Sequence, residues 1–114
     1  MILKYHKTLT REKWGSFSFY KQILMIANEL NRAKNWIEKK DAGELALCYE
    51  RAFELLYLTI EALKETNKRR ELLRFKEMLG ALYLKKPPML EENTQLLKAL
   101  LSLDRKAYLC GEHL

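Results

Sequence analysis

One sequence feature constrains the fold more than any other: apolar residues recur at helical spacing between residues 19 and 37. The apolar positions, alternately four and three residues apart, are Phe19, Ile23, Ile26, Leu30, Ala33 and Ile37. Residues with this spacing line one side of an α-helix, whereas a strand would alternate every second residue. We therefore predict one long amphipathic helix that ends near Lys39 and Lys40, two cations suited to a helix C-terminus.

A second helix is predicted to begin directly after it. Asp41 and Glu44 have the spacing of an N-cap residue and the acidic residue three positions later. The helix that they open carries two apolar seams side by side, which predicts neighbours on two sides and a central place in the fold. The seams are Leu45, Cys48, Ala52, Leu55, Thr59 and Leu63, beside Tyr49, Phe53, Leu56 and Ile60. We expect this helix to end near residues 65–67.

Two more helices are predicted in the second half of the chain. The third spans about residues 68–85 and is ended by Pro87 and Pro88, because the residue before a proline avoids the α region. A single fourth helix follows over about residues 91–110, and Gly111 is expected to terminate it.

The connections between these segments are short, which predicts that consecutive helices run antiparallel. Residues 1–15 are expected to form an arm or a short extra helix. The predicted fold class is therefore all-α: one domain over residues 1–114, built as an antiparallel helical bundle of about four helices.

Composition favours the same fold class. Valine, which favours strands, is absent, and four glycines with two prolines give too few turns for a sandwich or barrel. No run approaches the ~18 apolar residues of a membrane helix, and the first seven residues resemble no targeting segment. We expect a cytoplasmic protein without membrane contact. Glu and Lys dominate the charges, with aspartate only at Asp41 and Asp104, as is typical of thermophilic proteins.

The sequence lacks the residues that several common kinds of site require. Cys48 and Cys110 are too few for a disulfide framework, so we expect a buried thiol at Cys48 and a free thiol at Cys110. The only histidines, His6 and His113, lie outside the predicted helical core, which argues against a histidine-containing metal site and nucleophilic catalysis. A glycine-rich phosphate loop is also missing. We expect no metal, no cofactor and no catalytic residue, and hence a non-enzymatic protein.

The first candidate site is a polar face on the helix predicted for residues 19–40. Its members, spaced so that they point the same way, are Asn28, Asn31, Arg32 and Asn35, with Trp36 alongside. Three asparagines are unusual in a helix because asparagine is a middling helix former. The face is suited to hydrogen bonding with bases or with a partner's backbone, with Trp36 as a stacking surface. The alternative is a solvated face beside a tryptophan at its rim.

The second candidate is a polar cluster within the bundle. It combines carboxylates and arginines from three helices: Glu29, Glu50, Arg51, Glu54, Glu71 and Arg74. Such a cluster is either a pocket with shifted pKa values or a set of interhelical surface pairs that contribute little individually. An enzyme that uses it would need these side chains to converge in a concave pocket.

The third candidate is a basic block. The formal net charge of +6 is concentrated in residues 1–22 and 67–88. The second of these segments contains Lys68, Arg69, Arg70, Arg74 and Lys76, and the arm adds Lys4, Lys7, Arg11 and Lys13, with Tyr5 and Trp14 among them. Cations that open a helix oppose its macrodipole, and a bound phosphate would relieve that conflict. A solvated loop and a C-terminal extension of the preceding helix are the alternatives.

Aromatic residues are abundant for a domain of this size. They include Phe17, Phe19 and Tyr20 near the start of the first long helix, and Tyr57 and Tyr83 off the main seams. Apolar surface left uncovered usually forms an interface. We expect a homodimer formed through the first two long helices.

The chain resembles a group of small uncharacterised bacterial all-helical proteins over about residues 14–80. The segments that carry this resemblance are residues 22–33, 50–60 and 70–74. The architecture is more distantly similar to HEPN domains and to the helical substrate-binding subunits of minimal nucleotidyltransferases, an analogy of fold alone. HEPN ribonucleases carry an arginine followed four to six residues later by a histidine, and no pair here has that spacing. An HEPN-like fold would therefore imply binding without ribonuclease activity.

Two functions follow from the sequence. The first is a non-enzymatic interaction module or accessory subunit that binds a protein partner or a second copy of itself. The alternative is an RNA- or nucleotide-binding protein of HEPN-like type that lacks the ribonuclease motif, with the basic segments as its contact surface.

Overall fold

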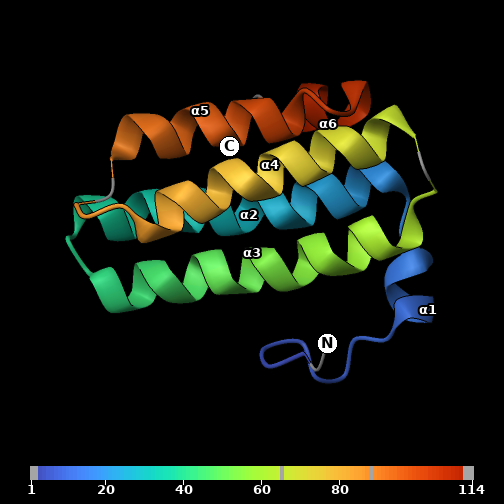
Figure 1. The fold of residues 1–114 in the computed structure, drawn as a ribbon, viewed down its shortest axis with the longest axis horizontal. Coiled ribbons are helices and arrows are strands. Elements are labelled where there is room, and N and C mark those ends of the chain that lie inside the picture. Colours follow the sequence, from blue (N-terminus) through green and yellow to red (C-terminus); the bar gives the residue numbers. More distant parts are fainter. Residues whose placement is uncertain (1–2, 65, 88, 112–114) are drawn as a thin grey trace.

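The computed structural model describes residues 3–64, 66–87 and 89–111. Every regular element within these residues is a helix, and four long helices form the bundle (Figure 1). They are α2 Phe19–Glu38, α3 Ala42–Ala62, α4 Asn67–Leu84 and α5 Leu90–Leu101, with the short α1 Arg11–Gly15 before them and α6 Arg105–Gly111 after them. The predicted all-α bundle is confirmed.

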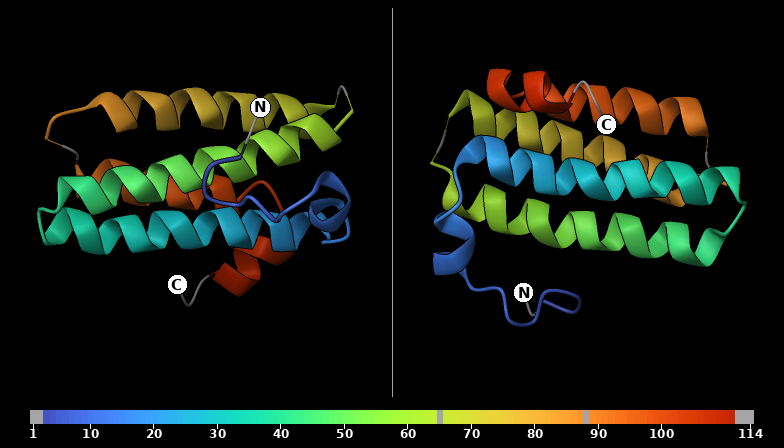
Figure 2. Two further views of the ribbon diagram at one scale, coloured as in Figure 1. Left: turned by 90° about the horizontal axis from the view of Figure 1, so that it is seen from below. Right: turned by 180° about the vertical axis from the view of Figure 1, so that it is seen from behind.

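The four long helices pack around one core. Helix α2 contacts α3 and α5, and α4 contacts the same two helices from the other side, while α6 folds back onto α2 and α5 and α1 packs on α3 (Figure 2). Consecutive long helices run antiparallel (Figure 1). Helices α2, α4 and α6 consequently begin at one end of the bundle, and α3 and α5 begin at the other.

The turn between α2 and α3 is built from adjacent residues. The Asp41 carboxylate accepts a hydrogen bond from the backbone N–H of Glu44 at 3.1 Å, so the predicted N-cap is confirmed. Lys40 has a positive φ of 58°, and the N–H groups of Lys40 and Asp41 reach back to the carbonyls of Ile37 and Trp36. This is the Schellman arrangement that ends many helices, with lysine at the position that glycine usually takes.

The predicted fourth helix is wrong in one respect, because it breaks in two. Helix α5 ends at Leu101, and Asp104 begins α6 by accepting a hydrogen bond from the N–H of Ala107 at 3.0 Å. Ser102 bonds back to the carbonyl of Ala99, which competes with the regular helical ladder. Helix α6 runs to Gly111, the residue expected to end this helical segment.

The core contains the apolar stripes predicted from the sequence, together with one residue that the sequence placed in the arm. Trp14 is 1% exposed and donates its indole N–H to the Thr59 hydroxyl at 3.0 Å. Its backbone carbonyl accepts a hydrogen bond from the Gln22 amide at 2.9 Å. Trp14 therefore anchors α1 in the core and is not available for the nucleic-acid contact suggested for it. Cys48 is buried and Cys110 is exposed, as expected.

None of the helices in the described part of the chain is both long and apolar enough to cross a membrane.

Candidate functional site

The six residues of the expected polar cluster form three separate groups rather than one pocket. Buried Glu29 pairs with Arg51 across the α2–α3 interface at 2.8 Å and with Arg32 along α2 at 3.1 Å. Glu71 and Arg74 form an exposed pair within α4 at 3.3 Å. Because Glu50 and Glu54 bond to neither arginine, the convergence that an enzyme would need from this cluster is missing.

Glu54 instead holds the N-terminal arm, residues 3–9, against α3. Glu54 is only 3% exposed. Its carboxylate accepts hydrogen bonds from the backbone N–H groups of three consecutive residues, Lys4, Tyr5 and His6, at 2.8–3.2 Å. The imidazole Nδ1 of His6 lies 3.1 Å from the same carboxylate. Three successive N–H groups form a concave anion site, so the arm wraps around a charge that would otherwise be buried without a partner.

Glu50, one helical turn before Glu54, adds a second attachment. One of its oxygens accepts the Tyr5 hydroxyl at 2.5 Å and the other accepts the Tyr83 hydroxyl of α4 at 2.8 Å. The carboxylate thereby joins the arm, α3 and α4. The sequence carried a signal for this arrangement: two carboxylates four residues apart on the most apolar helix need buried partners.

These contacts shift the titration of the groups involved. Burial raises the pKa of Glu54, but hydrogen bonds from the backbone of Tyr5 and Lys4 and from His6 outweigh it, so the pKa lies below its ordinary value. The hydroxyls of Tyr5 and Tyr83 lower the pKa of Glu50. In return, the hydrogen bond to Glu50 raises the pKa of Tyr5 to about 12. Both carboxylates are therefore ionised and both phenols protonated at neutral pH, which is the state that holds the arm.

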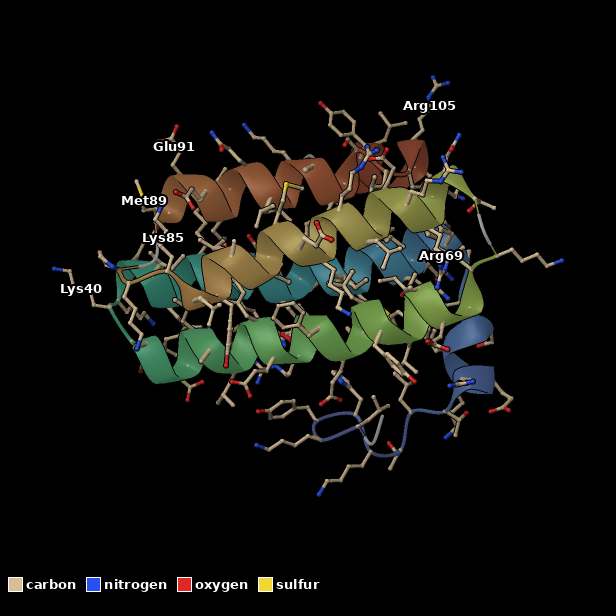
Figure 3. All side chains as sticks on the ribbon, in the orientation of Figure 1. Lys40, Arg69, Lys85, Met89, Glu91 and Arg105 are labelled. Atoms are coloured by element: carbon tan, nitrogen blue, oxygen red, sulfur yellow. The ribbon has the colours of Figure 1, made fainter. Side chains whose placement is uncertain are left out.

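A second feature lies at the end of the bundle where α2, α4 and α6 begin. Its basic residues, which we call the cationic end, are Lys21, Lys68, Arg69, Arg70, Arg105 and Lys106. Arg69 and Arg105 mark this end in Figure 3, and Lys40, Lys85 and Glu91 mark the opposite end. Helix α4 begins at Asn67, so the basic block does open a helix. Both alternatives, a solvated loop and a C-terminal extension of α3, are wrong.

Two lysines from other helices lie over aromatic rings at the start of α2. The Lys68 ammonium of α4 lies 4.6 Å from the centre of the Phe19 ring, and the Lys106 ammonium of α6 lies 4.3 Å from the centre of the neighbouring Tyr20 ring. Cations over aromatic faces are attracted by the ring quadrupole. Segments far apart in sequence therefore present positive charge together, whereas Lys76 lies two turns further along α4.

The asparagine face of α2 is solvent-facing at most of its positions. Asn28, Arg32 and Asn35 are exposed, whereas Asn31 is half-buried and lines a groove against α5 and α6. Trp36 is half-buried, and the Lys39 ammonium lies 5.1 Å from its ring centre. The structure therefore keeps the asparagines on one face and places Asn31 beside this groove.

The described residues contain no group of three or more His, Cys, Asp and Glu side chains placed to hold a metal ion.

No protein-family model matches this chain, and no curated protein or solved structure is significantly similar to it.

Proposed function

We propose that this chain is a non-enzymatic RNA-binding module that contacts the phosphate backbone through its cationic end. The observation that carries this proposal is the convergence of Lys68 and Lys106 on the adjacent rings of Phe19 and Tyr20. Positive charge from three helices then covers one end of the molecule. A surface of this kind attracts polyanions from a distance and binds them without reading their sequence.

The distribution of charge over the helix starts supports the proposal. Helices α3 and α5 begin with the acidic residues Glu44, Glu91 and Glu92, which the helix macrodipole favours. Helices α2 and α4 have no acidic residue in their first turns. Each cation placed there instead is unfavourable by roughly 0.3–1 kcal/mol. A bound phosphate group would offset that repulsion.

The opposite end also carries lysines, but their surroundings differ. Lys40 follows the C-terminus of α2, where the macrodipole favours a cation, and Lys85 pairs with Glu92. In the described part of the chain, Lys68, Arg70 and Lys106 form no ion pair with a carboxylate. These three cations therefore remain available to an external anion.

The proposal is tested by fluorescence anisotropy with a labelled single-stranded RNA of mixed sequence. We expect the logarithm of affinity to fall linearly with the logarithm of salt concentration, with a slope near −0.7 per phosphate contact. The triple variant Lys68→Glu, Arg70→Glu, Lys106→Glu should bind at least about tenfold more weakly at low salt and show a shallower slope.

Lys86→Glu is the matched control, since it reverses one exposed charge at the opposite end of the bundle. The single variant Lys68→Glu should weaken binding more than Lys86→Glu does. The proposal would be contradicted if the RNA did not bind at low salt, or if the two single variants lost equal affinity for it.

A second candidate function is self-association, and a specific surface favours it. Leu73, Met78 and Leu84 project from α4 and are 36%, 48% and 81% exposed. A partner helix packed along α4 would remove these side chains from water. This surface supports the interaction module predicted from the sequence, although it lies on α4 rather than on α2 and α3.

Sedimentation equilibrium tests this second candidate. A dimer formed through α4 should become monomeric on Leu84→Glu and should persist on Leu109→Glu, which alters an exposed leucine of α6. A wild-type chain that is monomeric at high micromolar concentration would exclude it.

A further inference from the structure

A groove of about 640 Å³ lies between α2, α5 and α6. It exists because the chain breaks after α5 and folds back, so that α6 lies against α5 and α2 (Figure 2). Gly111 permits the close approach, since a Cβ there would lie 2.7 Å from both methyl carbons of Leu101. The volume falls within the range of about 300–1,000 Å³ typical of small-molecule sites.

The lining of the groove is amphipathic. Leu97, Leu101 and the ring of Tyr108 supply apolar surface, and Asn31 supplies an amide. Two lysines flank the groove, Lys34 from α2 and Lys98 from α5, and none of its described lining residues is a carboxylate. The local charge is therefore positive and uncompensated.

Four polar side chains around the groove have no partners of their own, whereas Asn93, Thr94 and Ser102 are hydrogen-bonded. Within the described residues, the side chains of Asn31, Lys34, Lys98 and Tyr108 make no hydrogen bond, ion pair or ring contact. Lys34, Lys98 and Tyr108 are exposed, and Asn31 is half-buried. The groove thus combines an apolar floor with unoccupied donors from three helices.

We infer that this groove binds a small amphipathic anion. Its apolar body would pack against Leu97, Leu101 and the Tyr108 ring, and its carboxylate or phosphate would be held by Lys34 and Lys98. The lining residues include none from the cationic end, so this inference stands apart from the proposed RNA binding. Two sources share the required chemistry: a medium-chain acyl carboxylate and a nucleoside monophosphate.

The test is an NMR titration of ¹⁵N-labelled protein with decanoate and, separately, with adenosine monophosphate. Saturable shifts should appear at residues 31–34, 94–102 and 108–111, and the tighter of the two ligands identifies the source. The neutral counterparts, methyl decanoate and adenosine, should bind more weakly because they cannot engage the lysines. The variant Lys34→Gln, Lys98→Gln should lose affinity by about tenfold, the effect expected for removing a charge-assisted contact.

A matched control, Lys13→Gln with Lys76→Gln, removes the same charge from α1 and α4, two helices outside the groove, and should leave the affinity unchanged. The inference is overturned if neither anion gives saturable shifts at the groove, if the shifts map elsewhere, or if neutral and charged ligands bind equally. Equal losses in the two double variants would overturn it as well, since the attraction would then be a property of the whole surface.

Discussion

The carboxylate of Glu54 accepts the backbone N–H of Tyr5 at 2.8 Å, although the two residues lie 49 positions apart. The bond belongs to a set in which three consecutive backbone N–H groups of the arm surround one buried charge. Because the donors are backbone groups, the side chains of residues 4 and 5 contribute nothing to this part of the contact. This part of the docking of the arm therefore depends on the acceptor, which is a single side chain of α3.

Replacing that acceptor should release the arm. In Glu54→Gln the charge is lost and the amide NH₂ faces N–H donors, so we expect the free energy of unfolding to fall by about 1–3 kcal/mol. The measurements are chemical denaturation and the rate of limited proteolysis within residues 3–9. Glu61→Gln removes a more exposed carboxylate from the same helix and should change stability by less than about 0.5 kcal/mol. Similar losses from both variants would show that Glu54 has no special role.

Acid should release the arm for the same reason. The pKa values of Glu50 and Glu54 are lowered in the folded protein, so the folded state favours their ionised forms. Their contribution to stability is complete above the unfolded-state pKa of about 4.3 and is lost as pH falls through the lower folded-state values. The free energy of unfolding, measured between pH 7 and pH 3, should decline less steeply in Glu54→Gln than in the wild type. Parallel pH profiles would contradict this linkage.

The turn at Lys40 offers a stabilising substitution. Lysine at a φ of 58° is strained because its Cβ crowds the following carbonyl, and glycine has no Cβ. Lys40→Gly should therefore raise the free energy of unfolding by about 0.5 kcal/mol, after allowance for the greater freedom of glycine in the unfolded chain. Lys39 has a φ of −82°, so Lys39→Gly should instead destabilise the protein. Thermal denaturation of both variants checks the opposite signs, and a shared sign would refute the explanation.

Two helical glycines should respond oppositely to alanine. A Cβ at Gly111 would overlap the side chain of buried Leu101, so Gly111→Ala should destabilise the protein by about 1–2 kcal/mol. A Cβ at Gly80 would meet nothing within 4 Å, so Gly80→Ala should stabilise α4 by about 0.5–1 kcal/mol. Urea denaturation distinguishes the two. A stable Gly111→Ala protein would mean that α5 and α6 separate easily, and that the groove between them is not rigid.

The sequence alone determined the helices and most of their ends. The spacing of the stripe from Phe19 to Ile37 and the N-cap at Asp41 depend on residues three or four positions apart, so they can be recognised without knowing any distant contact. The break between α5 and α6 was missed even though Ser102 and Asp104 can be recognised as helix-breaking and capping residues. The continuous apolar spacing of that segment outweighed them in the prediction.

Only the tertiary structure decided which polar residues meet. Glu54 was expected to lie with arginines, but it lies with the backbone of the arm. Lys68 and Lys106 are far apart in the sequence and lie close together because each ammonium packs over a ring at the start of α2. The periodicity of a helix fixes which way a side chain points but not which helix stands opposite it. That choice depends on how four helices and an arm share one core, which is a property of the assembled chain and of no single segment.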